Sequence, residues 1–295
     1  MQESICSRAA RSGGLSPNDL ERYLTVARSA ADAGGQELMR HYGRLSSIES
    51  KGRIGDLVTN ADVAAERIVL EVLSDQTPDI AVLAEESGAT GQQNGLRWCV
   101  DPLDGTTNFA HGYPFFATSI GLTLGQQPIL GAIAVPFLNE MYWGAPGVGV
   151  FCNDTSLQVS SCDRLEDALL VTGFAYDRHT RLDNNYAEFC WFTHRTHGVR
   201  RGGAAAVDLA FVAAGRQDGY WERGLSPWDL AAGVALVDLA GGTVSGYGNQ
   251  PFDLSSGRVV AAGPGLHPAI TDELSQVKPL PGAAFGAPEV TAMGS

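Results

Sequence analysis

Residues 101–109 read DPLDGTTNF and place two carboxylates close together on a stiff stretch of chain. Pro102 fixes the backbone between Asp101 and Asp104, so both side chains and the Leu103 carbonyl can face one side. Hard cations such as Mg²⁺ prefer oxygen ligands of this kind, completed by water and phosphate oxygens. In a two-metal site the ions lie about 3.5–4 Å apart and share bridging carboxylates, a role that Asp101 is well placed to fill. The segment therefore predicts a divalent-metal site.

The residues that follow Asp104 are suited to binding a phosphate. Gly105 allows a ligand to approach the backbone closely. If Asp104 caps a short helix, the amides of Gly105 and Thr106 point outward at its positive end, where anions bind. The simpler alternative is a capped turn, which any D-x-x-D-G sequence can form. The full nine-residue string is far more specific than such a turn.

The elements before and after this motif must bring further acidic residues to it. IAVLA (80–84) and LRWCV (96–100) are typical of short buried strands, which end at Glu85 and Asp101. Carboxylates just beyond strand ends are where open α/β sheets place their chemistry. Apolar residues at helical spacing predict helices over residues 19–43 and 61–75.

The rest of the chain predicts a layered α/β (α+β) fold. Alternating apolar runs between residues 115 and 152 indicate a mostly antiparallel sheet. Beyond residue 163, strands and helices are mixed, and Pro227 marks the start of a helix that ends near Gly241. The predicted parts are a flexible tail (1–18), an α+β subdomain with the metal and phosphate site (19–160), an α/β subdomain with substrate contacts (161–272) and a flexible Pro/Gly/Ala-rich tail (273–295).

The amino-acid composition indicates which kinds of partner this protein can bind. The formal charge is −13, from 20 Lys and Arg against 33 Asp and Glu, which opposes binding to nucleic acids and to anionic membranes. Five cysteines without a C-x-x-C pair favour a reducing compartment. No apolar run resembles a secretory signal or a membrane span. We therefore expect a cytoplasmic protein with no nucleic-acid or membrane partner.

Several segments together resemble the inositol monophosphatase family, within the lithium-sensitive, Mg²⁺-dependent phosphatase superfamily. DPLDGTTNF resembles the family signature, and the other segments keep the family order over about residues 50 to 260. One departure is Ala84, where the family has Gly. The other matching segments are Lys51 with DLVT and Asp62, AEES (84–87), DL (208–209) with GYWE (219–222), and PWDLAAG (227–233).

The resemblance implies a set of metal ligands. Glu85, Asp101 and the Leu103 carbonyl would hold a first Mg²⁺ ion, and Asp101, Asp104 and Asp229 a second. Glu85 would also help to hold a third ion, which Asp62 would reach through water. The expected cofactor is therefore two or three Mg²⁺ ions. Taken singly, Asp229 could be an ordinary acid at a helix N-terminus, where the dipole favours it.

The resemblance also implies catalytic and substrate-binding roles. Thr106 and Asp62 would orient the attacking water, and Glu85 would join them as a catalytic residue. Glu222 would accept hydrogen bonds from substrate hydroxyls, and Ala204 replaces a hydroxyl-bearing residue of the family. The implied substrate-binding residues are Gly105, Thr106, Thr107, Gly203, Ala204, Glu222 and Asp229.

The expected activity is Mg²⁺-dependent hydrolysis of inositol 1-phosphate to myo-inositol and phosphate by metal-activated water. The resemblance further implies an alternating α-β-α-β-α sandwich, a homodimer and inhibition by lithium. Histidinol-phosphate phosphatase, bisphosphate nucleotidase and fructose-1,6-bisphosphatase are alternatives with the same metal core. An idle module that senses a small phosphorylated metabolite is the alternative from another class. Arg200 and Arg201 are typical of a solvated surface.

Overall fold

The computed structural model describes residues 4–91 and 95–278 of the 295-residue chain. The helices are α1 (Ile5–Ser12), α2 (Pro17–His41), α3 (Asn60–Gln76), α4 (Thr106–Ala110), α5 (Tyr186–Thr193), α6 (Ala205–Ala213), α7 (Pro227–Leu239) and α8 (His267–Gln276). The strands are β1 (Ile48–Ser50), β2 (Leu57–Thr59), β3 (Ala81–Ala84), β4 (Gly88–Thr90), β5 (Leu96–Asp104), β6 (Ala117–Leu124), β7 (Gln127–Val135), β8 (Glu140–Ala145), β9 (Gly149–Cys152), β10 (Thr155–Ser156), β11 (Leu169–Thr172), β12 (Gly198–Arg200), β13 (Gly219–Arg223), β14 (Thr243–Ser245) and β15 (Arg258–Ala262).

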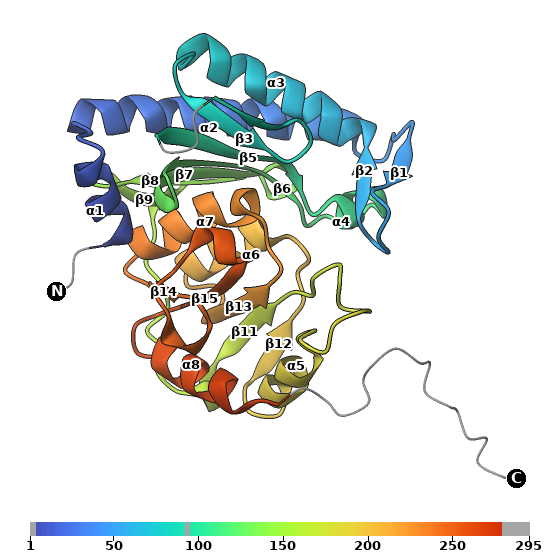
Figure 1. Ribbon diagram of the computed structural model, residues 1–295, viewed down its shortest axis with the longest axis vertical. Coiled ribbons are helices and arrows are strands. Elements are labelled where there is room, and N and C mark those ends of the chain that lie inside the picture. Colours follow the sequence, from blue (N-terminus) through green and yellow to red (C-terminus); the bar gives the residue numbers. More distant parts are fainter. Residues whose placement is uncertain (1–3, 92–94, 279–295) are drawn as a thin grey trace, which may run out of the picture.

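These elements form five layers (Figure 1). Helices α2 and α3 cover the outer face of an eight-stranded sheet with the order β10-β9-β8-β7-β6-β5-β3-β4. Helices α6 and α7 fill the space between that sheet and a five-stranded sheet with the order β12-β11-β13-β15-β14. Helices α5 and α8 lie beyond the second sheet. The layered α-β-α-β-α sandwich is thus confirmed.

The eight-stranded sheet is antiparallel except where β3 pairs with β5, as the alternating apolar pattern predicted. One expectation about it is wrong: the strand that begins at Leu96 continues through Asp101 to Asp104. A register shift between these two aspartates marks a bulge, in which Pro102 is tolerated because the regular ladder is interrupted there. The bulge keeps both carboxylates on rigid, buried backbone.

Small residues allow α7 to lie directly on the large sheet. A Cβ added to Gly121 of β6 would come within 2.7 Å of Ala231 Cβ, and one added to Gly131 of β7 within 2.6 Å of Ala232 Cα. Only glycine permits this spacing, since a Cβ atom does not come so close to the heavy atoms of another segment. The close approach fixes the N-terminal end of α7, which carries Asp229, against the sheet that carries Asp101 and Asp104.

The N-terminal segment is not the loose tail predicted for residues 1–18. Ser4 caps α1, and the backbone amides of Ile5 and Cys6 donate to the Asp238 carboxylate at 3.0 and 2.9 Å. Ser16 then caps α2, whose first residue is Pro17. Polar caps thus begin two helices in a stretch that lacks a long apolar run.

The predicted C-terminal tail begins too early, because α8 extends to Gln276. The remainder of that prediction, residues 279–295, lies outside the described residues, as do residues 1–3. Within the described part of the chain, no helix is both long and apolar enough to cross a membrane.

Candidate active site

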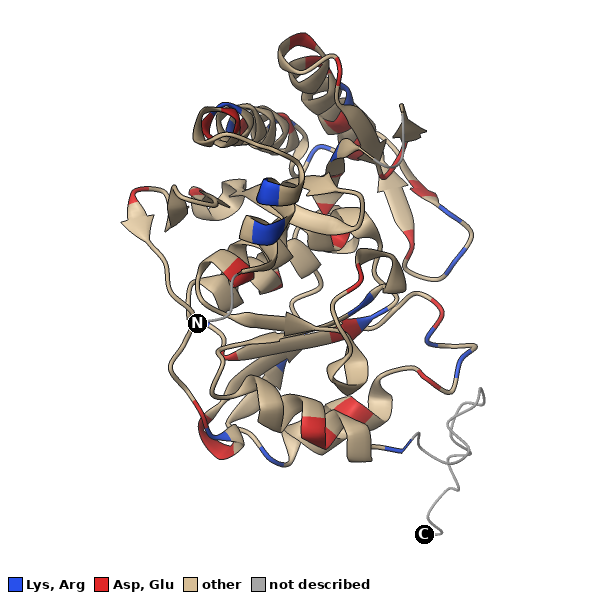
Figure 2. Cartoon of the chain, turned by 60° about the vertical axis from the view of Figure 1, so that its left-hand side comes forward, with Lys and Arg blue, Asp and Glu red and all other residues tan. Residues whose placement is uncertain are grey.

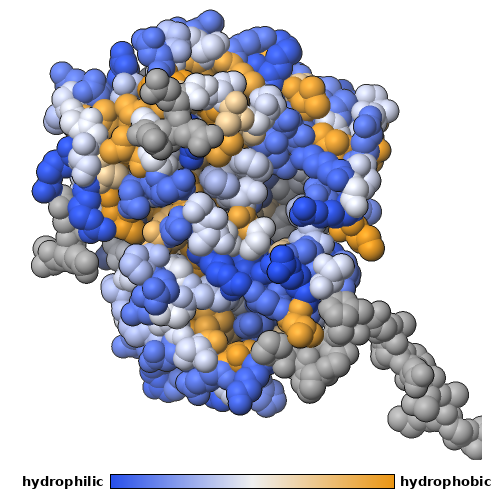
Figure 3. Space-filling view, in the orientation of Figure 1, coloured by the Kyte–Doolittle hydropathy of each residue, from blue (hydrophilic) through white to orange (hydrophobic). Residues whose placement is uncertain are grey.

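A cavity of about 370 Å³ opens between the two sheets and is lined by residues of both halves of the chain. Figure 3 shows hydrophilic residues gathered where these halves meet. Its acidic side, here called the carboxylate wall, is formed by Glu85, Asp101, Asp104 and Asp229. Its other side, the substrate wall, is formed by residues 173–176, Arg178, residues 203–205 and Glu222.

Asp104 links the two halves. Its carboxylate accepts from the backbone amides of Ala205 and Ala206 at 3.1 and 2.8 Å, and so caps α6 from 101 residues away in sequence. Helix α6 has no capping side chain of its own, since its N-cap is Ala204. Helix α4 in turn begins after Gly105, whose φ of 90° suits glycine, so Asp104 does not cap the helix that directly follows it.

Asp229 has a local role and faces the cavity as well. It lies in the first turn of α7, and its Oδ2 accepts from the Ser226 amide at 2.6 Å. This capping geometry is the ordinary reading of an acid at that position. Asp229 also lines the cavity with Glu85 and Asp101, so one side chain caps α7 and faces the cavity.

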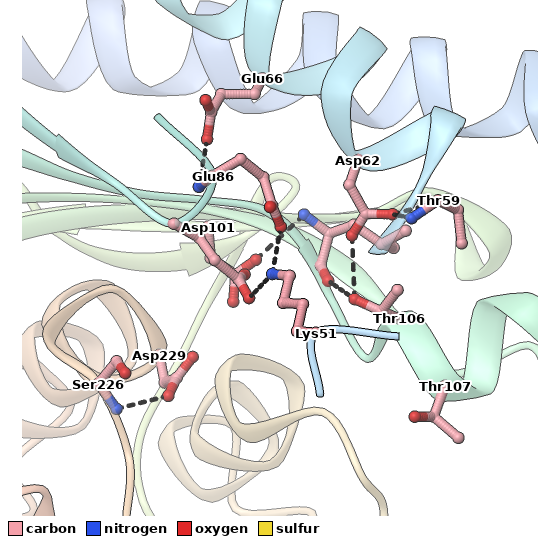
Figure 4. A network of polar contacts seen from close by, with 12 residues as sticks. Lys51, Thr59, Asp62, Glu66, Glu86, Asp101, Thr106, Thr107, Ser226 and Asp229 are labelled. Carbon is pink, nitrogen blue, oxygen red and sulfur yellow. Dashed lines mark hydrogen bonds and ion pairs between the residues drawn. The ribbon is translucent and has the colours of Figure 1, made fainter. Parts of the chain in front are cut away.

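Asp62 and Thr106 form a buried hydrogen-bonded pair behind the carboxylate wall (Figure 4). Thr106 Oγ1 lies 3.0 Å from Asp62 Oδ1 and 3.0 Å from the Leu103 carbonyl oxygen. Asp62 Oδ2 accepts from the amide and hydroxyl of Thr59 at 2.8 and 2.6 Å, which fixes the carboxylate at the start of α3. Thr106 lines the cavity and Asp62 does not, so Asp62 is linked to the cavity through its hydrogen bond with Thr106.

The turn that carries Glu85 and Glu86 is held from two sides. Lys51 Nζ donates to Glu85 Oε1 at 2.9 Å and to Glu86 Oε1 at 2.5 Å (Figure 4). From behind, the Glu66 carboxylate on α3 accepts from the amides of Glu86 and Ser87, both at 2.9 Å. No sequence motif indicated Glu66, which is one helical turn beyond Asp62.

Burial and mutual repulsion disfavour the charged forms of the carboxylates in the carboxylate wall. Burial raises the pKa of Asp101 well above its usual range, and the nearby charges of Glu85, Asp104 and Asp229 add to this. Burial likewise raises the pKa of Glu85, Asp104 and Asp229 to about 7 each. Burial alone would lower the pKa of Lys51, but Glu85 and Glu86 outweigh it and raise that pKa. Of the four carboxylates, Lys51 contacts Glu85 alone, so the wall is suited to a bound cation.

The substrate wall offers a carboxylate for hydroxyl groups. Glu222 on β13 is 8% exposed, and burial raises its pKa to about 7. Tyr220 Oη donates to Glu222 Oε2 at 2.6 Å, which orients the carboxylate. Gly203 and Ala204 lie at the start of α6, and Gly203 adopts a φ of +84°.

The same arrangement of segments occurs in known proteins. The model of the family described as "Inositol monophosphatase family" matches residues 19–278. The chain belongs to the inositol monophosphatase family. It is 50% identical over 262 residues to an inositol-1-monophosphatase of Synechocystis sp., covering 88% of this chain and 91% of that protein. It is 39% identical over 251 residues to a fructose-1,6-bisphosphatase/inositol-1-monophosphatase of Aquifex aeolicus, covering 84% of this chain and 94% of that protein.

Solved structures agree with this assignment. The inositol monophosphatase of Anabaena (Nostoc) sp. superposes with a TM-score of 0.82 at 46% identity, and the match covers 89% of this chain and 98% of that one. Members of the inositol monophosphatase family are metal-dependent phosphatases.

The donor set of this family member fits a hard divalent cation. Four carboxylates and the Leu103 carbonyl line one cavity, and oxygen is the ligand such ions require. Within residues 4–91 and 95–278, however, no three acidic, histidine or cysteine side chains are already gathered as a ligand set. In this structure Lys51 holds Glu85, and backbone amides hold Asp104 and Asp229.

The structure brings nearly all the predicted residues together. Those that line the cavity are Glu85, Asp101, Leu103, Asp104, Gly105, Thr106, Thr107, Gly203, Ala204, Glu222 and Asp229. Sequence reasoning missed residues 173–176 and Arg178, which belong to none of the matching segments. It favoured a solvated surface for Arg200 and Arg201 over contact with an anion, and Arg201 lines the cavity. Arg53 and Arg178 line it as well, so loops of both halves bring positive charge to an acidic site (Figure 2).

Proposed function

We propose that this chain is a Mg²⁺-dependent phosphomonoesterase that hydrolyses inositol 1-phosphate to myo-inositol and phosphate. The observation that carries the proposal is the convergence of Glu85, Asp101, Asp104 and Asp229, from distant segments, on one cavity beside the buried Asp62–Thr106 pair. Family membership and the names of the relatives support it.

Mg²⁺ at the carboxylate wall would neutralise the phosphate and lower the pKa of a bound water. Two or three ions agree with the number of carboxylates. Glu85, Asp101, the Leu103 carbonyl, Asp104 and Asp229 would supply the ligands. Burial of these oxygens excludes competing water, which strengthens their attraction for a cation.

The chain's own residues would direct the water and its proton. Thr106 Oγ1 donates to Asp62 Oδ1, which leaves the hydroxyl oxygen free to accept from the attacking water. Asp62 is fully buried, and burial raises the pKa of this carboxyl, which favours its taking a proton. The water oxygen would bond to phosphorus as the bond to the inositol oxygen breaks, and the departing oxygen would take a proton from solvent water, which gives myo-inositol and phosphate.

The remaining groups would hold the substrate. The backbone around Gly105 and Thr107 would seat the phosphate, and Gly203 and Ala204 would line the approach from the other half. Glu222 would accept hydrogen bonds from ring hydroxyls, with Tyr220 fixing its orientation. The homodimer and inhibition by lithium stay predictions from the family resemblance, and the cytoplasmic location stays a prediction from the composition.

The test is phosphate release from inositol 1-phosphate with Mg²⁺ and with a chelator. Histidinol phosphate, adenosine 3′,5′-bisphosphate and fructose 1,6-bisphosphate serve as competitors. Asp104→Asn should lower kcat at least about a hundredfold, because the variant loses a charge that stabilises the transition state through the cation. Asp154→Asn, which changes an exposed aspartate outside the cavity, is the matched control. Turnover that persists in chelator, or that is faster on a competitor, would contradict the proposal.

A further inference from the structure

Residues 173–177 run along the end of β13 and approach it closely at three successive points. A Cβ added to Gly173 would lie 2.2 Å from Glu222 Oε2, and one added to Gly224 would lie 2.5 Å from Ala175 Cβ. Both approaches depend on glycine, since a side chain would force the segments apart. The three contacts are Gly173 with Glu222, Ala175 with Gly224 and Asp177 with Arg223.

The third pair is a two-pronged ion pair. Arg223 Nη1 and Nη2 donate to the two carboxylate oxygens of Asp177 at 2.7 and 2.8 Å, and the Arg223 side chain is only 9% exposed. Asp183 lies 3.6 Å from Arg223 Nε and also binds Arg258 on the neighbouring strand β15. A bidentate pair fixes orientation as well as distance. The loop is therefore anchored to the strand that carries Glu222.

The residues on either side of Asp177, Tyr176 and Arg178, line the cavity. Residues of the loop between β1 and β2 line the same cavity. Arg178 Nη2 would lie 3.9 Å from a Cβ on Gly55. Tyr176 is 43% exposed, and a phenol is protonated at neutral pH, so it can donate a hydrogen bond.

We propose that Tyr176 is a specificity-determining residue for the alcohol part of the substrate, and that the Arg223–Asp177 ion pair positions it. A substrate hydroxyl group both donates and accepts, and Glu222, which accepts from Tyr220 Oη, offers it an acceptor. Tyr176 adds a phenolic donor, from a segment whose first residue, Gly173, contacts Glu222. Together they select polyhydroxylated alcohols over alcohols without hydroxyl groups. This inference rests on the proposed function of the site.

The first test removes only the phenol oxygen. Tyr176→Phe should raise KM for inositol 1-phosphate about threefold to tenfold, the usual effect of one lost hydrogen bond, with kcat nearly unchanged. KM for 4-nitrophenyl phosphate, whose alcohol part has no further hydroxyl, should change less than twofold. Tyr113→Phe is the matched control, because Tyr113 is 55% exposed and lies outside the cavity.

The second test addresses positioning. Asp177→Asn and Arg223→Gln should raise KM for inositol 1-phosphate as Tyr176→Phe does, and Arg223→Lys should recover part of the loss. The double variant Tyr176→Phe/Asp177→Asn should be no worse than Tyr176→Phe alone, since the ion pair acts through Tyr176. Thermal melts check folding, and Asp177→Asn keeps the test informative if Arg223→Gln does not fold.

The outcomes separate the two proposals. Wild-type turnover of inositol 1-phosphate with an unchanged KM in Tyr176→Phe overturns this inference and leaves the proposed function standing. An equal rise in KM for both substrates also overturns it, because the effect would then be general. No wild-type turnover of inositol 1-phosphate overturns the proposed function itself, and this inference with it.

Discussion

On the carboxylate wall, Asp101 and Asp104 are 2% and 7% exposed and lie on the central strand β5, whereas Tyr176 on the substrate wall is 43% exposed and lies on a loop. The first wall is fixed by backbone: a bulged strand, helix caps and a helix packed on glycines. The second is fixed by tertiary contacts of residues 173–178 with the end of β13. The difference indicates a division of labour, in which rigid carboxylates serve the chemistry and an anchored loop serves recognition.

The largest expected effect lies on the chemical side. Thr106→Ala and Asp62→Asn should each lower kcat about a hundredfold to a thousandfold, with little change in KM, because they remove the pair that directs the water. The double variant should be little worse than either single one, since the two side chains act as a unit. Steady-state kinetics on inositol 1-phosphate provide the measurement.

Thr155→Ala, on an exposed edge strand, is the control for loss of a threonine hydroxyl. A loss that appeared mainly in KM would place Thr106 in substrate recognition and would remove the contrast between the two walls.

The next effect should lie on the recognition side. Gly173→Ala introduces a Cβ that would lie 2.2 Å from the Glu222 carboxylate, so this carboxylate must move. We expect KM for inositol 1-phosphate to rise about tenfold, the consequence of losing roughly 1.4 kcal/mol of binding. The change in kcat should be smaller, because the carboxylate wall is untouched.

Gly95→Ala is the matched control, since nothing lies within 4 Å of its added Cβ. If Gly173→Ala reduced kcat rather than KM, the substrate wall would take part in the chemistry and the proposed division of labour would be wrong.

The same contrast explains what the sequence could reveal. In the carboxylate wall, the local spacing in DPLDGTTNF indicates Asp101 and Asp104 as ligands, whereas Glu85 and Asp229 are implied by the family resemblance. The helices over residues 19–43 and 61–75 were found within a few residues. The bond from Asp104 to the N-terminus of α6 was not predictable, because no pattern links residues so far apart in sequence. The one hint was that α6 lacks a capping residue.

The substrate wall left almost no signal in the sequence. Gly173, Ala175 and Asp177 matter through their alignment with β13, and that alignment exists only after the five-stranded sheet has formed. The prediction of a loose N-terminal tail was wrong for a related reason. Helix α1 is stabilised by Asp238, far along the chain, as well as by its own cap. Tertiary partners of this kind override local composition.

The smallest effect concerns the stability of the metal-free protein. The native pKa values of Glu85, Asp104 and Asp229, about 7 each, lie above the usual value of about 4 for unfolded carboxyl groups. Between about pH 4 and pH 7 the native state therefore binds more protons than the unfolded state. It follows that the contribution of these groups to stability is full below about pH 4 and is lost as the pH rises through 7.

Asp101→Asn should reverse part of that loss, because it removes one of four like charges and keeps an oxygen for the Leu103 amide, 3.1 Å away. In chelator at pH 8, the variant should be about 1 kcal/mol more stable than the wild type, a figure of the order of one pKa unit. At pH 5 the difference should shrink, since the carboxylates are then largely protonated. Mg²⁺ at pH 8 should invert the order of stability, because the wild type gains more from a cation that binds only the native state.

Urea unfolding with Asp154→Asn as control measures all three conditions. A wild type that became more stable from pH 5 to pH 8 in chelator would show that the carboxylate wall carries no strain, and rigid backbone would then be the only feature separating it from the substrate wall.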